Sequence, residues 1–205
     1  KNHIQESKEQ YNSLYPHLND TNFTSKLSVK KEFNDLKIEE KKREDIDNIE
    51  KVSTNLCNPN IDFELSSHQM FVRNFLSSET PYNGLLLFHG LGTGKTCSSI
   101  SVCEDMRIYN NQMENKKKII IVASPVVQEN YKLQLFDERR LKLINGFWNI
   151  NSCTGNKFIN EINPMGIEMS KKQVIQSIKQ IINESYTFMG YTKFANKINT
   201  IIQKA

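Results

Sequence analysis

Short apolar runs separated by helical patterns dominate the chain from residue 61 onward. The runs at 85–88 and 119–123 have the length and composition of buried β-strands, and 186–191 reads as a third strand. Apolar spacing at helical intervals predicts five helices, over 67–78, 95–110, 125–143, 171–183 and 193–203. Because strands bounded by turns alternate with helices, the pattern indicates an α/β fold with a parallel sheet.

The first 60 residues follow a different pattern. Between 28 and 52, charges of both signs alternate while apolar residues recur at helical spacing. The apolar positions are Val29, Phe33, Leu36, Ile46, Ile49 and Val52. We expect one or two amphipathic helices lying on a larger body, followed by a turn at 58–60. The predicted organisation is therefore a charged helical extension over 1–60 and a second domain over 61–205.

Charge and composition exclude several classes of protein. The chain has 205 residues and a formal net charge of +4, and its longest apolar run is five residues. A membrane span needs about 20, so no membrane partner is expected. The four cysteines are 40, 6 and 50 residues apart, which matches no zinc-binding pattern.

The strongest chemical signal is the run HGLGTGKT at 89–96, between an apolar run and a helix rich in small residues. Gly92 and Gly94 match the G-x-G-K-T form of a phosphate-binding loop, although His89 stands where the general pattern has its first glycine. Glycines let backbone N–H groups converge on phosphate oxygens, and the following helix directs its positive end at the same anion. Lys95 can reach the β- and γ-phosphates of a nucleotide, and the Thr96 hydroxyl can ligate Mg²⁺.

This loop gives the candidate site residues. Lys95 and Thr96 are the candidate catalytic residues, and Thr96 is the candidate metal ligand. The candidate nucleotide-binding residues of the loop are Gly90, Leu91, Gly92, Thr93, Gly94, Lys95, Thr96 and Cys97.

The residues flanking the loop indicate which kind of nucleotide-binding protein this is. The segment 63–69, FELSSHQ, resembles the adenine-reading Q motif of superfamily 2 helicases, with Gln69 as the reading residue. The Gln amide suits adenine because it can donate and accept at once. In such helicases the nucleic-acid backbone is held where strands end and helices begin. The residues at those places here are Ser124, Pro125, Gly190, Tyr191 and Thr192.

Four longer stretches make the resemblance more specific. They are TPYNGLLLFHGLGTGKTC at 80–97, ASPVVQEN at 123–130, QLFDE at 134–138 and CTGNK at 153–157. They are similar to superfamily 2 helicases of large nucleocytoplasmic DNA viruses, akin to the poxvirus early transcription factor small subunit and nucleoside triphosphatase I. Asfarviruses and mimivirus-type viruses have members of the same group.

That resemblance covers about residues 62–205 and carries several implications. It implies a P-loop, RecA-like parallel sheet flanked by helices, with ATP and Mg²⁺ as cofactors. It implies DNA or RNA as a partner, together with viral transcription or virion proteins. It also implies a location in the host cytoplasm, at the viral factory, or in the virion.

A motor of this kind also needs an acidic D-E-x-H/D motif at a strand end and a second lobe with arginine fingers. Asp137 and Glu138 follow a helical pattern, and Glu184 continues the predicted amphipathic helix directly after Asn183, so none of them fits. We therefore expect the lobe to be incomplete at its C-terminal end and this piece alone to hydrolyse ATP poorly.

Three hypotheses follow. The first is the N-terminal ATP-binding section of a viral helicase or translocase. The second is a non-catalytic nucleotide-binding assembly or transcription-factor module of a virion complex. The third is an unrelated P-loop ATPase such as an AAA+ protein, which the position of Gln69 disfavours.

Overall fold

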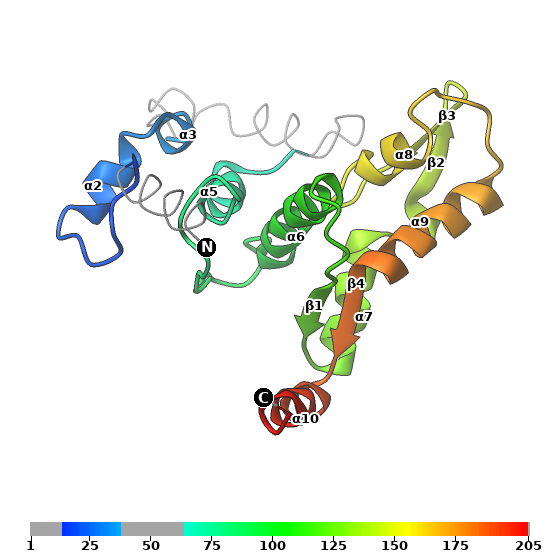
Figure 1. Ribbon diagram of the computed structural model, residues 1–205. Helices are drawn as coiled ribbons and strands as arrows, with labels where there is room; N and C mark the ends of the chain where they lie inside the picture. The colour runs from blue at the N-terminus through cyan, green and yellow to red at the C-terminus, as the bar shows by residue number, and fades with distance from the viewer. Residues whose placement is uncertain (1–13, 38–63, 205) are drawn as a thin grey trace. The chain divides into compact units, whose positions relative to one another are not determined.

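The computed structural model describes residues 14–37 and 64–204 (Figure 1). Contacts divide the chain into two compact units, one up to Val102 and one from Cys103, with the boundary inside helix α6 (Lys95–Gln112). The boundary expected at residue 60 lies outside the described residues and stays a prediction. Within the described ranges, no helix combines the length and apolar character needed to cross a membrane.

The first unit is built around helix α5 (Ser67–Phe75), against which α2 (Phe23–Ser28) and α3 (Lys31–Asn34) pack through aromatic side chains. The buried cluster consists of Leu27, Phe33, Phe75 and Tyr82. The Tyr82 ring stacks on Phe75 with centroids 4.4 Å apart, and its hydroxyl donates to the Pro16 carbonyl at 2.7 Å. Residues 14–37 therefore share one hydrophobic core with α5. Of the predicted N-terminal helical pattern, the part over 38–63 lies outside the described residues.

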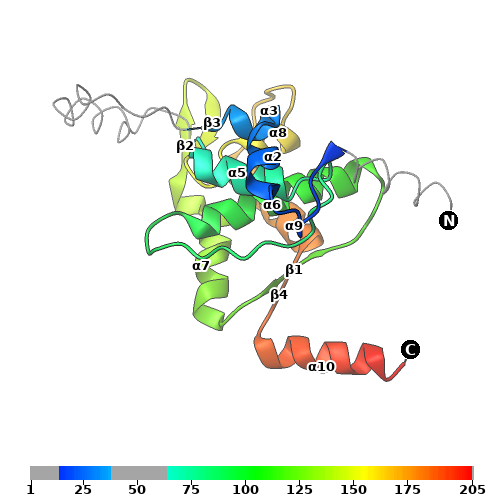
Figure 2. The same cartoon turned by 90° about the vertical axis from the view of Figure 1, so that its left-hand side faces the viewer.

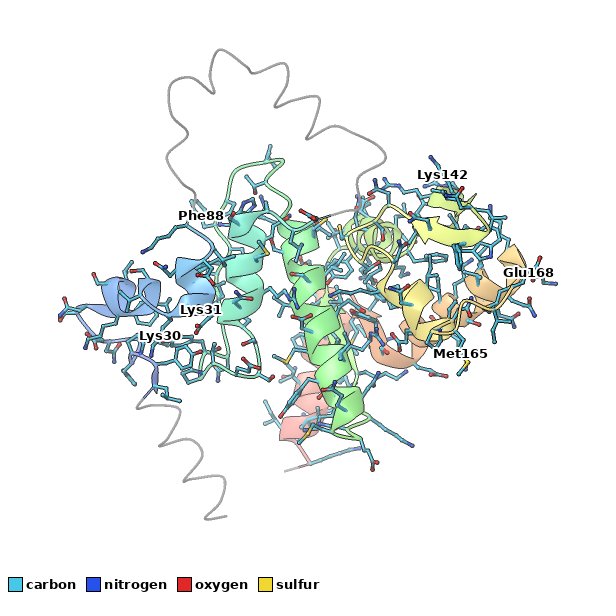
Figure 3. The ribbon with its side chains drawn as sticks, turned by 90° about the horizontal axis from the view of Figure 1, so that it is seen from above. Lys30, Lys31, Phe88, Lys142, Met165 and Glu168 are labelled. Carbon is cyan, nitrogen blue, oxygen red and sulfur yellow. The ribbon has the colours of Figure 1, made fainter. Side chains whose placement is uncertain are left out.

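The buried strand expected at 85–88 does not form. The structure has an extended loop there between α5 and α6, with Leu86 85% and Phe88 93% exposed (Figures 1 and 3). A strand needs a neighbour that bonds its backbone N–H and C=O groups. Among the described residues β1 pairs with β4 and β2 with β3, so neither pair includes 85–88. The prediction is wrong for this segment because apolar composition alone supplies no pairing partner.

The second unit contains a parallel pair of strands, β1 (Ile119–Val122) and β4 (Tyr186–Met189). They are in register from Ile119 opposite Tyr186 to Val122 opposite Met189. Figure 2 shows the two strands next to each other. Helix α9 (Lys171–Ser185) leads into β4, and α10 (Tyr191–Ile202) leaves it. The α/β class with a small parallel sheet is thus confirmed.

The long helix expected over 125–143 is wrong in its second half. Helix α7 (Pro125–Leu135) ends early, and a short 3₁₀ turn, η2 (Glu138–Arg140), leads to an antiparallel hairpin. The hairpin joins β2 (Leu141–Ile144) to β3 (Phe147–Ile150). Its turn residues Asn145 and Gly146 have φ of +50° and +83°, which suits the Asn-Gly turns of two-residue hairpins.

A hydrophobic core joins the hairpin to α8 (Lys157–Ile162) and α9. Its buried members are Phe136, Leu141, Ile150, Phe158, Ile159, Val174 and Ile178. The Trp148 indole N–H donates to the Met169 carbonyl at 2.8 Å, which fastens β3 to the segment before α9. All of these residues lie between β1 and β4 in the sequence.

A buried ionic network holds the second half of α6 to β4 and α8. The Arg107 guanidinium donates to Glu104 at 2.9 Å and to both oxygens of Glu161, at 2.6 and 2.9 Å. The Tyr186 hydroxyl donates to the other oxygen of Glu104 at 2.5 Å. Burial raises the pKa of Tyr186, and the negative charge of Glu104 raises it further. Glu104 and Arg107 are 1% and 3% exposed, so the network compensates charges that would otherwise be buried alone.

Candidate nucleotide-binding site

The loop at 89–94 has the backbone geometry that its glycines predict. Gly92 and Gly94 have φ of +79° and +74°, in the left-handed region that residues with a Cβ avoid. At Gly92 a Cβ atom would meet nothing within 4 Å. At Gly94 it would overlap the side-chain amide nitrogen of Gln69, so this position needs glycine for two independent reasons.

Lys95 begins helix α6, and its side chain turns back over the loop. The ammonium donates to the carbonyls of His89 at 3.0 Å and Gly90 at 2.7 Å. An ammonium group has three protons, so one remains for an anion held in the loop. The Thr93 hydroxyl also donates to Gly90 at 3.1 Å, which closes the loop on itself.

Helix α5 contacts the loop through two consecutive side chains. Gln69, which is 7% exposed, donates to the Gly94 carbonyl at 3.2 Å and accepts from the Ser66 backbone N–H at 2.9 Å. His68 bonds the Thr93 carbonyl through Nε2 at 2.8 Å. The structure therefore brings Gln69 to the glycine-rich loop, as its sequence position suggested. Each atom of the Gln69 amide keeps capacity for one further bond, so adenine reading stays a prediction.

The other loop residues expected at the site lie around the same turn. Leu91 is fully exposed, Thr96 is exposed, and Cys97 lies in the first turn of α6. His68 was not expected. The sequence offers no signal for it beyond its place beside Gln69, because a lone histidine on a helix is usually a surface residue.

The residues expected to hold nucleic acid lie in the second unit, at the carboxyl ends of its two parallel strands. Ser124 is the residue before α7, with Pro125 in its first turn, and Gly190 is the residue before α10. The Ala123 N–H donates to the Met189 carbonyl at 3.1 Å, so both helix starts lie at one edge of the sheet. Tyr191 and Thr192 form the first turn of α10, and Tyr191 is 66% exposed. The structure thus brings these two groups of residues together.

The acidic residues considered at the sequence level have protein partners. Asp137 accepts from the backbone N–H and guanidinium of Arg139, and the side-chain bond to Arg139 lowers the pKa of the Asp137 carboxyl. Glu138 pairs with Lys179 at 2.7 Å. Glu184 accepts from Gln180 at 2.9 Å. Over 14–37 and 64–204, no group of three His, Cys, Asp or Glu side chains could hold a metal ion.

Several viral proteins are similar to this chain. A mimivirus (Acanthamoeba polyphaga mimivirus) protein named "Putative ATP-dependent RNA helicase" is 26% identical over 197 residues, or 94% of this chain. A second mimivirus protein with that name is 30% identical over 67% of the chain. The "Putative helicase" of Frog virus 3 is 29% identical over 67% of the chain. The resemblance to helicases of large nucleocytoplasmic DNA viruses is therefore confirmed.

A shorter match extends to African swine fever virus, whose "Early transcription factor large subunit homolog" is 40% identical over 61 residues. The chain spans only 16% and 22% of the two mimivirus proteins and 13% of the Frog virus 3 protein. No family model matches the chain, and no solved structure matches it.

Proposed function

We propose that this chain, as a relative of helicases of large nucleocytoplasmic DNA viruses, is the ATP-binding section of a motor that moves on nucleic acid. One observation carries the proposal: a loop with two glycines at positive φ leads directly into Lys95 and an 18-residue helix. This arrangement turns backbone donors, a helix N-terminus and one ammonium group toward the same small volume. The proposal includes a larger RecA-like sheet than the described strands form.

The residues at the loop fit a nucleoside triphosphate with Mg²⁺. The bound nucleotide supplies the phosphoanhydride bond whose hydrolysis drives movement. Gly92 would leave room for phosphate oxygens near the backbone, Gly94 provides the positive φ at the entry to α6, and Lys95 would lie against the charge of the phosphates. The exposed Thr96 hydroxyl would ligate the Mg²⁺ ion, and Gln69 would contact adenine. The carboxylates that a complete metal site needs would come from other parts of the motor.

The nucleic-acid track would lie against the edge where β1 and β4 end. Ser124 offers a hydroxyl there, Tyr191 offers an exposed ring for stacking, and helices α7 and α10 both begin at this edge. Backbone N–H groups at helix starts and hydroxyl groups hold phosphates without reading sequence. Contacts of this kind suit a protein that moves along its track.

The decisive measurement is the affinity for Mg²⁺·ATP of the wild type and of Lys95→Ala, determined by titration calorimetry on the full-length protein. Charge-assisted hydrogen bonds contribute about 1.5–3 kcal/mol each, so Lys95→Ala should weaken binding at least about tenfold. Lys37→Ala, an exposed lysine of the same unit, is the matched control and should bind like the wild type. Equal affinity for wild type and Lys95→Ala would contradict the nucleotide site.

A non-catalytic module of a viral transcription complex is the second candidate, because one relative is named as a transcription-factor subunit homolog. ATP turnover with and without single- and double-stranded DNA and RNA separates the two. A motor turns over ATP faster when its track is present. A binding module retains ATP without such stimulation.

A further inference from the structure

We infer that His68 is a positioning residue that orients the phosphate loop for anion binding. The inference rests on the proposed nucleotide site and adds to it a residue that takes no part in the glycine-lysine pattern. It follows from the hydrogen bonds that join the first turn of α5 to the two peptide units on either side of Gly94.

The bonding partners of His68 fix which of its ring nitrogens carries the proton. The Thr93 carbonyl can only accept, so Nε2, at 2.8 Å, must be the donor. In the neutral ring Nδ1 is then an acceptor, and it lies 3.0 Å from the Ser66 hydroxyl, which can donate to it. The His89 ring meets the His68 ring edge to face, with centroids 5.9 Å apart. The imidazole is therefore held on three sides although it is exposed.

The bond from His68 to the Thr93 carbonyl also fixes the direction of the Gly94 N–H, which belongs to the same peptide unit. In a planar trans peptide the C=O and N–H groups point in opposite directions. When His68 holds the Thr93 carbonyl toward α5, the Gly94 N–H must point away from α5. The Gly94 carbonyl accepts from Gln69 at 3.2 Å and also from the Ser98 backbone N–H of α6 at 3.0 Å, and these two bonds fix the Gly94–Lys95 peptide.

Two consecutive N–H groups on one side of the backbone form the concave arrangement that binds anions. Glycine at position 94 allows that arrangement but does not select it, because glycine tolerates many backbone conformations. His68 selects the orientation of the Thr93–Gly94 peptide, while Gln69 and the Ser98 N–H of α6 together select that of the next peptide. Without the His68 bond, the Thr93–Gly94 peptide is free to rotate and the loop must be ordered again whenever an anion binds.

Three variants of position 68 test this role. His68→Phe keeps a ring of similar shape but removes the donor, whereas His68→Gln retains an N–H that can reach the Thr93 carbonyl. A neutral hydrogen bond is worth a factor of about three to ten in an equilibrium constant. His68→Phe should therefore weaken Mg²⁺·ATP binding about threefold to tenfold, and His68→Gln should restore most of it. His68→Asn, whose amide is too short to reach, should behave like His68→Phe.

The control is His17→Phe, an exposed histidine of the same unit that should leave the affinity unchanged. A second measurement needs no nucleotide: amide hydrogen exchange of the peptide covering 89–97, with millisecond labelling, in the full-length protein. Exchange there should be faster in His68→Phe than in the wild type or His68→Gln.

These readouts separate the two proposals. If the wild type fails to bind nucleotide, the proposed function falls, and the exchange rates alone decide whether His68 orders the loop. If His68→Phe binds nucleotide as well as the wild type, or His68→Gln binds as weakly as His68→Phe, the positioning role is overturned. Equal exchange in wild type and His68→Phe overturns it as well.

Discussion

Replacing Gly94 by alanine would add a methyl group where the Gln69 side chain already lies. This change destabilises the loop in two ways, through backbone strain at a positive φ and through overlap with Gln69. The two effects can be separated, because other glycines of the chain have only the first or neither. Gly94 has a positive φ and no space, Gly92 has a positive φ and open space, and Gly84 has open space without a positive φ. Alanine at the three positions therefore forms a graded series.

The magnitudes follow from these environments. A non-glycine residue held in the left-handed region costs about 1–2 kcal/mol, which is the whole effect expected for Gly92→Ala. Gly94→Ala carries the same strain and also displaces Gln69 from the Gly94 carbonyl and from the Ser66 N–H. Each lost bond costs about 1 kcal/mol, so the total should reach about 3–4 kcal/mol. Gly84→Ala should cost nothing, or stabilise slightly by restricting the unfolded chain.

The assay is urea unfolding of each variant, with the double variant Gly94→Ala/Gln69→Ala to complete a cycle. Truncating Gln69 removes the overlapping atoms, so the double variant should be less destabilised than the sum of the two single variants. If Gly94→Ala proved no more costly than Gly92→Ala, or if the two substitutions at 94 and 69 were additive, the contact between Gln69 and the loop would be refuted.

The buried network around Glu104 gives three further predictions. Tyr186→Phe should cost about 1–3 kcal/mol because it removes a buried bond to Glu104, whereas Tyr191→Phe, on an exposed ring, should cost nothing measurable by urea unfolding. Since the pKa of Tyr186 is raised by folding, its contribution is complete below a pH of about 10 and is lost as the pH rises further. The tyrosine absorbance at 295 nm that appears only with unfolding should therefore be smaller by one residue in Tyr186→Phe than in the wild type. Arg107→Met should cost about 3–5 kcal/mol by leaving the buried Glu104 carboxylate without an opposite charge, while Lys132→Met, which breaks an exposed pair, should change stability by under about 1 kcal/mol.

Much of the second unit could be predicted because its elements are specified locally. The helix over 171–183 and the strands at 119–123 and 186–191 have strong periodic or β-branched patterns, and all were found within a few residues. The hairpin was missed although Asn145-Gly146 stands between two apolar segments, a pattern typical of hairpins. The prediction of one helix through residue 143 rests on helical spacing alone, and the Asn-Gly turn contradicts it.

The segment at 85–88 failed for a different reason. Its apolar composition indicates what it would bury, but a strand exists only where another strand bonds to it, and that information is not local. At the loop, the glycines and Lys95 could be identified from their spacing. The hydrogen bond from His68 could not, because it depends on the distance between a helix and a loop 25 positions further along the chain.

The connection between β1 and β4 bears on how the chain folds. Closing a flexible loop of that length costs conformational entropy, and parallel strands separated by many residues pair late. Here the intervening chain has its own core, formed by the hairpin, α8 and α9, whose members all lie between Phe136 and Ile178. Once that core forms, the ends of the connection are held by a folded body rather than by a flexible chain. The parallel pair then closes over a much shorter effective distance, so we expect this core to form before the sheet.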